Sequence, residues 1–176
     1  MKKFVLIVFS ILFLGLLIPT RSSGQIDVEL YAGIGYTGVD IVGWTYINPY
    51  DWNQGMGHVY AQAFPLNIGI ISIGAEFGFQ HFFWYERYNY TEENVDAFRF
   101  MGIVRAYLTD KLYTELGPGA YRFGDWTDFG VMGAFGYKIG VTERLSIPIK
   151  LRAAIILDED SNLYPVGLSA GLAYSF

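Results

Sequence analysis

The sequence predicts an all-β protein: a closed, antiparallel, eight-stranded β-barrel that spans a membrane. Apolar residues make up 52% and aromatic residues 18% of the 176 residues. Beyond the amino terminus they occur mostly at alternate positions, a pattern typical of strands with two different faces. A transmembrane strand needs only about 9–11 residues, whereas a transmembrane helix needs roughly 20 consecutive apolar ones. The way the apolar residues are spread therefore favours spanning strands.

The amino terminus has the three parts of a secretory signal peptide. A basic start and an apolar run over 4–18 are followed by small and polar residues up to Gly24. This order predicts export and cleavage before Gln25. A membrane anchor is the alternative, but the run is short for a spanning helix. We expect a signal peptide over 1–24 and one barrel domain over 25–176.

Charge and composition exclude several classes of function. Cleavage would remove Lys2, Lys3 and Arg21 and no acid, which moves the formal charge from -5 to -8. So acidic a chain is poorly suited to binding nucleic acid. Because there is no cysteine, disulfides, zinc-thiolate sites and thiol nucleophiles are excluded. Metal-ligand spacings and nucleotide-binding fingerprints are not recognisable either, so we expect no cofactor and no metal.

Eight stretches of the chain carry the strand pattern. We expect strands at 26–36, 58–68, 70–86, 95–108, 112–123, 128–140, 145–156 and 165–176. In the last and clearest of them, apolar residues from Val166 to Phe176 alternate with smaller ones. The second has no clean alternation, so its faces stay unassigned. Pro118 and Pro148 fall inside predicted strands, where proline removes a ladder hydrogen bond and usually marks a bulge or a strand end.

The predicted connections alternate in length. Short ones at 66–69, 109–111 and 141–144 alternate with longer ones at 37–57, 87–94 and 157–164, and only the short link 124–127 departs from this order. Bacterial barrels have short turns at the periplasmic end and longer loops at the extracellular end. We therefore expect both chain termini at the periplasmic end.

Charged residues fall on one face of the predicted strands. They are Asp27, Glu29, Glu76, Arg99, Arg105, Glu115, Lys138, Lys150 and Arg152. An arginine or lysine that faces lipid at mid-bilayer costs about 2–4 kcal/mol, so turning this face outward would cost on the order of 20 kcal/mol. We assign the charged face to the interior. A soluble sandwich or lipocalin-like barrel has the opposite arrangement, with a polar outside and an apolar core.

Eight strands enclose a lumen just wide enough to be filled by side chains. Buried charges are tolerated only when they are paired. We therefore expect a structural charge network formed by Glu29, Glu76, Glu115, Arg105, Lys138 and Lys150. A narrow gated ion path or proton relay is the alternative interpretation of the same residues.

The carboxy terminus carries a family resemblance. The segment Leu172-Ala173-Tyr174-Ser175-Phe176 resembles the carboxy-terminal signal of outer-membrane barrels. With eight strands, the whole of 25–176 resembles the small barrels of the outer-membrane protein A and outer-membrane protein X type. The resemblance is one of architecture. It implies location in a Gram-negative outer membrane, contact with outer-membrane lipid, and recognition by the barrel assembly machinery through the strand that ends at Phe176.

Aromatic residues gather at the predicted extracellular end. Trp44, Tyr46, Tyr50 and Trp52 lie in the long first connection, and we take them as a candidate loop for binding an extracellular partner. A second group consists of Phe82, Trp84, Tyr85, Tyr88 and Tyr90. We expect this group to form an aromatic girdle at the membrane interface.

The sequence gives little support for catalysis. His58 and His81 are the two histidines, and neither has a serine in a recognisable triad arrangement. We expect a structural or surface-interaction role, in adhesion or partner binding, with no catalytic activity. Two alternatives stay open: a lipid-modifying outer-membrane enzyme of the lipid A deacylase or acyltransferase type, and the narrow gated channel.

Overall fold

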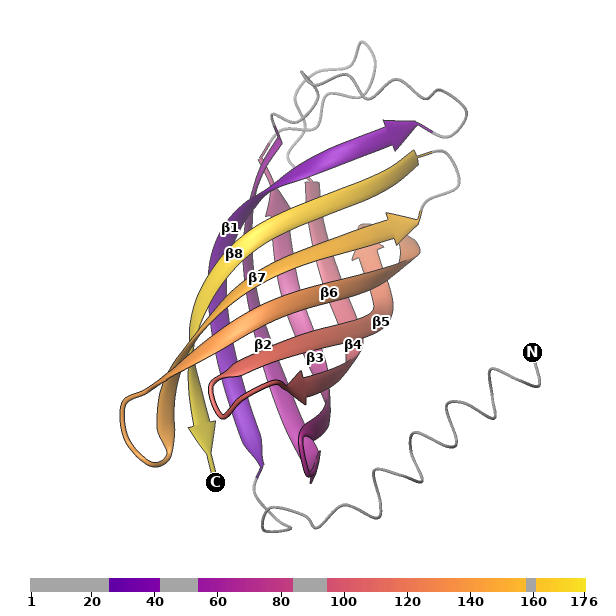
Figure 1. The fold of residues 1–176 in the computed structure, drawn as a ribbon. Coiled ribbons are helices and arrows are strands. Elements are labelled where there is room, and N and C mark those ends of the chain that lie inside the picture. Colours follow the sequence, from indigo (N-terminus) through magenta and orange to yellow (C-terminus); the bar gives the residue numbers. More distant parts are fainter. Residues whose placement is uncertain (1–25, 42–53, 84–94, 158–160) are drawn as a thin grey trace, which may run out of the picture.

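The computed structural model of the protein is a closed antiparallel barrel in which each strand pairs with its neighbours in the sequence and the last pairs with the first (Figure 1). The structure describes residues 26–41, 54–83, 95–157 and 161–176. The strands are β1 (Asp27–Ile41), β2 (Gln54–Ile68), β3 (Ile71–Phe82), β4 (Val95–Tyr107), β5 (Leu112–Phe123), β6 (Trp126–Gly140), β7 (Leu145–Leu157) and β8 (Ser161–Ser175). In the described ranges, no helix is long and apolar enough to cross a membrane.

The strands are strongly staggered around the barrel. Following paired residues from Glu29 through all eight strands leads back to β1 at Val39, ten residues further along. A closed barrel requires such a stagger, which tilts the strands against the barrel axis. The tilt brings inward residues from distant parts of the sequence to the same height in the lumen.

The irregular pattern of β2 has a local cause at Pro65. The register between β2 and β3 shifts by one residue between Ala63 and Leu66, which is a β-bulge. Even-numbered residues face inward up to Phe64, and beyond the bulge Asn67 pairs with the inward-facing Ser72. The alternation therefore changes phase within the strand, so the sequence could not assign its faces.

Pro118 and Pro148 lie within strands and mark neither a bulge nor an end, so this expectation was wrong. Each interrupts the ladder on one side only, towards β4 and towards β8 respectively. In both ladders the pairing resumes beyond the proline in the same register. The closed barrel thus accommodates the missing backbone donors without shifting a strand.

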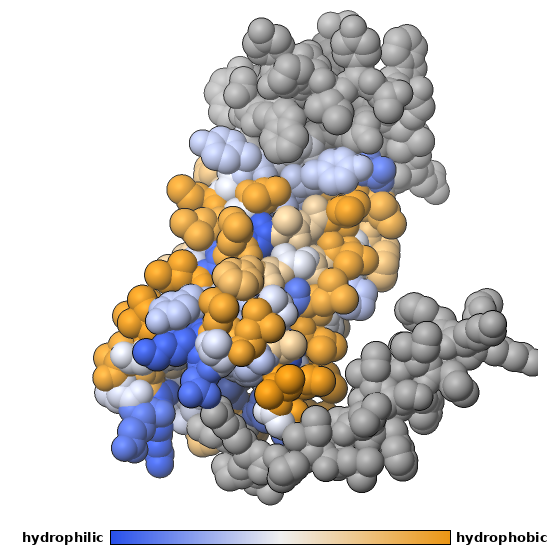
Figure 2. Space-filling view, in the orientation of Figure 1, coloured by the Kyte–Doolittle hydropathy of each residue, from blue (hydrophilic) through white to orange (hydrophobic). Residues whose placement is uncertain are grey.

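The two faces of the wall differ as expected for a barrel in lipid. Exposed outward residues include Leu30, Ile34, Phe77, Phe100, Leu116, Leu151 and Leu168. Figure 2 shows apolar side chains over most of the visible wall, with hydrophilic ones gathered towards the lower end. All nine charged residues assigned to the interior from the sequence face the lumen.

The carboxy terminus and the start of β1 lie at the lower end in Figure 1. The short turns at 69–70, 108–111 and 141–144 lie at this end, and β1, β3 and β7 end at the other. The β5–β6 turn also lies at the upper end and is tight, with Gly124 at φ 56°. Because β1 runs on to Ile41 and β2 begins at Gln54, the first connection is shorter than the predicted 37–57.

Candidate functional site

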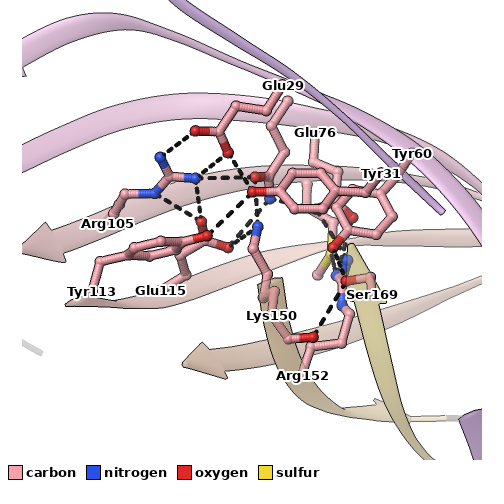
Figure 3. Close-up of polar contacts among 12 residues, drawn as sticks. Glu29, Tyr31, Tyr60, Glu76, Arg105, Tyr113, Glu115, Lys150, Arg152 and Ser169 are labelled. Carbon is pink, nitrogen blue, oxygen red and sulfur yellow. Dashed lines mark hydrogen bonds and ion pairs between the residues drawn. The ribbon is translucent and has the colours of Figure 1, made fainter. Parts of the chain in front are cut away.

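The lumen holds two clusters of charged side chains, which are the candidate site. The lower cluster is made of Glu29, Arg105, Glu115, Lys138 and Lys150. Arg105 Nη2 lies 2.5 Å from Glu29 Oε2 and 2.6 Å from Glu115 Oε1 (Figure 3). Lys138 Nζ lies 2.7 Å from Glu29 Oε1, and Lys150 Nζ lies 2.9 Å from Glu115 Oε2. Each cation of the lower cluster therefore contacts a carboxylate.

Aromatic rings enclose the lower cluster. The Arg105 guanidinium lies 3.9 Å from the ring centroid of Phe64 and 4.3 Å from that of Tyr113. Lys150 Nζ lies 4.1 Å from the ring centroid of Tyr31, whose hydroxyl donates to Glu29 at 2.6 Å. Cations over ring faces are further stabilised by the electrostatics of the π-system.

The upper cluster is made of Glu76, Arg99 and Arg152, with Gln62 between the two clusters. Arg99 Nε lies 2.6 Å and Arg152 Nη2 3.0 Å from Glu76 Oε1. Gln62 Nε2 donates to Glu76 at 2.7 Å, and Gln62 Oε1 accepts from Lys150 Nζ at 2.7 Å. The structure thus brings the six predicted network residues together. It adds Gln62, Arg99 and Arg152, and it pairs Glu76 with the two arginines.

Inward glycines make room for these long side chains. A Cβ atom at Gly136 would collide with the ring of Tyr113, and one at Gly78 would lie 2.9 Å from Arg99 Nε. In both cases the space beside the glycine is already filled by a residue of a neighbouring strand. Glycine on the inner face is therefore required by the packing of the lumen.

An apolar group that the sequence analysis missed fills the upper end of the lumen. This apolar cap consists of Met56, Phe82, Ala97, Phe123, Ile156 and Leu163, all buried. The rings of Phe82 and Phe123 lie 6.0 Å apart. Phe82 is 1% exposed and faces inward, so its assignment to the outer aromatic girdle was wrong. The signal was present, because Phe82 continues the inward series of Glu76 and Gln80 at two-residue spacing.

The other aromatic residues singled out from the sequence lie outside the described residues. They are Trp44, Tyr46, Tyr50 and Trp52 of the candidate binding loop, and Trp84, Tyr85, Tyr88 and Tyr90 of the predicted girdle. Outward aromatic residues do occur at both ends of the described wall: Tyr36 at the upper end, and Tyr137, Tyr174 and Phe176 at the lower end. The last two stack edge-to-face at 4.8 Å.

The two histidines lie on opposite sides of the wall. His58 faces inward and is 3% exposed. His81 faces outward, and its Nδ1 lies 2.5 Å from Asp96 Oδ1 on the adjacent strand. Its described neighbours along and across the strands are Phe79, Phe83, Gly57 and Asp96, none of which offers a hydroxyl nucleophile. In the described part of the chain, no group of three or more acidic or histidine side chains is placed to hold a metal ion.

Comparison with solved structures identifies the fold. The chain aligns with the outer membrane protein OprG from Pseudomonas aeruginosa at a TM-score of 0.60 and 10% identity, covering 90% of this chain and 99% of that one. Neisserial surface protein A gives 0.55 at 15% identity, with coverages of 87% and 99%. The attachment invasion locus protein Ail of Yersinia pestis gives 0.51 at 11% identity, with coverages of 87% and 100%. No protein-family model and no curated protein matches the sequence.

These likenesses, at such low identity, concern the fold. The chain shares the closed eight-stranded fold of these small outer-membrane barrels, and its own wall is apolar on the outside and charged on the inside. The lumen chemistry is that of a filled interior, in which charges are held by opposite charges, amides and aromatic rings.

Proposed function

We propose that the protein is a closed, non-conducting outer-membrane barrel that carries its extracellular connections as a structural or adhesive surface. The observation behind the proposal is the filling of the lumen. A network of paired charges occupies its middle, and the apolar cap lies above that network at the extracellular end. Function then belongs to the ends and the outer wall.

The filled lumen argues against a channel. An ion that entered from outside would have to shed its water to pass Phe82, Phe123 and Ile156, which are each at most 3% exposed. It would next have to displace an ion pair such as Arg105–Glu29. Both steps are costly, because buried charges depend on their existing partners.

Conductance measurements test the closed state. We expect the protein, extracted in detergent and inserted into a planar lipid bilayer, to give no current steps in 1 M KCl. Replacing both Phe82 and Phe123 with alanine removes the rings of the cap. The current through this variant shows what a loosened lumen would conduct. Regular current steps from the unaltered protein would replace this proposal with the channel interpretation.

The adhesive part of the proposal rests on the first connection. Residues 42–53 contain the four aromatic residues of the candidate loop and join two long strands, of which β1 is paired with β8 as far as Ile41. Exposed aromatic residues supply much of the energy in protein interfaces. One structural neighbour is named an attachment invasion locus protein, but at 11% identity the two chains share only the fold, so the role is inferred from this loop.

Loop deletion tests the adhesive role. Non-adherent bacteria that display the protein would be measured on immobilised fibronectin, laminin, collagen and glycan arrays. We expect attachment to at least one surface, lost when 42–53 is replaced by a short glycine-serine link and kept when 87–92 is replaced in the same way. Attachment that survives the first replacement, or is absent from every surface, would contradict the role. Both deletions leave the described strands intact.

A lipid-modifying enzyme is the second candidate function, and one observation favours it. His81 and Asp96 form a hydrogen-bonded pair on the lipid-facing wall, and such a pair is the base-orienting half of a hydrolytic triad. Mass spectrometry of lipid A and phospholipids from cells with and without the protein tests it. A product that disappears in His81→Ala would support this function, whereas unchanged lipids in cells that express the protein would dispose of it.

A further inference from the structure

Three buried nitrogen atoms beneath the apolar cap have no hydrogen-bond partner among the described residues. They are His58 Nδ1, His58 Nε2 and Arg99 Nη2. The two side chains are only 3% and 2% exposed. Buried polar groups without partners are rare in folded proteins, because such a group loses its bonds to water without gaining others. These two side chains therefore offer bonding capacity that no described residue uses.

The unused groups lie in one neighbourhood of the lumen. His58 is directly opposite Gln80 in the β2–β3 ladder, and Gln80 Oε1 accepts from Arg99 Nη1 at 2.8 Å. The Tyr60 ring centroid lies 5.6 Å from the His58 ring centroid and 4.7 Å from Arg99 Cζ. His58 and Arg99 thus border the same two residues.

The surrounding charges are unequal. Arg99 and Arg152 both contact Glu76. Both oxygens of Glu76 are already engaged, since the second accepts from Gln62 at 2.7 Å and from Arg152 at 3.2 Å. Asp128 also faces inward nearer the upper end and has interactions of its own. Arg99 and Arg152 thus share the carboxylate of Glu76.

We propose that the upper cluster binds a small inorganic anion, chloride, between Arg99 and His58. Arg99 Nη2 and an N–H of the His58 imidazole would donate to it. A halide accepts from several N–H groups and also supplies the negative charge that a buried cation requires. A water molecule in the same place would satisfy the donors but leave the charges unequal.

The packing around His58 holds its ring beside this site. A Cβ atom at Gly167 would lie 2.8 Å from His58 Cε1, and one at Gly33 would collide with His58 Nε2. The imidazole therefore rests against the bare backbones of β1 and β8. Its position is fixed by strands other than its own, as a binding site for a small ion requires.

Bromide, which has an anomalous X-ray signal, is the probe for the site. Crystals of the detergent-extracted protein grown in sodium bromide should show an anomalous peak within hydrogen-bonding distance of Arg99 Nη2. In solution, we expect the thermal unfolding midpoint to be several degrees higher in sodium chloride than in sodium gluconate at equal ionic strength, because only the folded state binds the ion.

A pair of matched variants completes the test. His58→Phe keeps a ring but removes the donors and should abolish the chloride-specific shift, whereas His81→Phe, on the outer wall, should retain it. If His58→Phe does not fold, the bromide crystals decide alone. The absence of a bromide peak, together with equal midpoints in chloride and gluconate, would overturn the proposal and leave water as the partner of these groups.

Discussion

Arg105 and Glu29 are 76 residues apart in the sequence and face each other across the lumen, with Nη1–Oε1 at 2.7 Å and Nη2–Oε2 at 2.5 Å. This is a bidentate pair, the strongest arrangement of guanidinium and carboxylate. The same guanidinium donates to Glu115 through Nε at 2.9 Å and through Nη2 at 2.6 Å. One side chain thus connects β1, β4 and β5.

The first prediction concerns the removal of this guanidinium. Arg105→Met should lower the free energy of unfolding by about 3–5 kcal/mol, because it leaves buried carboxylates uncompensated. Arg105→Lys should lose less, since it keeps the charge but not the bidentate geometry. Urea unfolding in detergent micelles, followed by tryptophan fluorescence, measures both. The control is Arg122→Met on the exposed side of β5, and equal losses at the two positions would contradict the role assigned to Arg105.

The second prediction concerns an inward glycine. A Cβ atom at Gly136 would collide with the ring of Tyr113, which is paired with it across β5 and β6. Gly136→Ala should therefore destabilise the barrel by about 1–3 kcal/mol through overpacking. At Gly102 nothing lies within 4 Å of the added atom, so Gly102→Ala should be neutral or slightly stabilising.

A double variant separates this steric effect from any other. Shortening the neighbour with Tyr113→Leu should reduce the cost of Gly136→Ala, because the two positions are coupled. The unaltered protein, the two single variants and the double variant form a double-mutant cycle. Urea unfolding measures the free energy of unfolding of each. Strictly additive free energies would show that the collision is relieved elsewhere.

The strands and their faces could be predicted from the sequence because one effect, the cost of placing a charged side chain in lipid, dominates both. Each inward arginine or lysine would cost about 2–4 kcal/mol if it faced lipid at mid-bilayer, and each inward acid somewhat less, so alternation at two-residue spacing is enforced along the spanning strands. Where alternation changes phase, as at the bulge beside Pro65, the same pattern becomes ambiguous. The sequence also failed to predict how far β1 and β8 extend at the upper end. β1 continues to Ile41 and β8 begins at Ser161, both outside the predicted strands at 26–36 and 165–176.

The interior was harder to predict than the wall. Pairing between Glu76 and Arg152 depends on the stagger of the strands, because the stagger sets the height of each side chain in the lumen. The sequence of a single strand does not reveal this stagger. The apolar cap was missed for a different reason. Phe82 and Phe123 are as apolar as the lipid-facing residues, and only their spacing from Glu76 and Glu115 places them inside.

The third prediction follows from two adjacent phenylalanines. Phe82 is 1% exposed within the cap, whereas Phe83 is 48% exposed outside it. Phe82→Ala should cost about 3–5 kcal/mol of unfolding free energy, the usual range for emptying a packed site. Phe83→Ala should cost clearly less. The urea midpoints of the two variants measure the difference, provided that the unfolding free energy falls with urea at the same slope in both. Similar losses for the two variants would mean that the cap is loosely packed.

The fourth prediction tests the lipid-facing assignment by depth. Leu151 faces outward near the middle of β7 and is 54% exposed, and Leu157 faces outward at its upper end and is 50% exposed. Arginine at a mid-bilayer position costs about 2–4 kcal/mol, and the cost falls to about 0–1 kcal/mol near the interface. Leu151→Arg should therefore destabilise the barrel in phospholipid vesicles far more than Leu157→Arg does. In a soluble barrel both positions would be surface sites and both changes nearly neutral, so equal unfolding free energies would reverse the assignment of inside and outside.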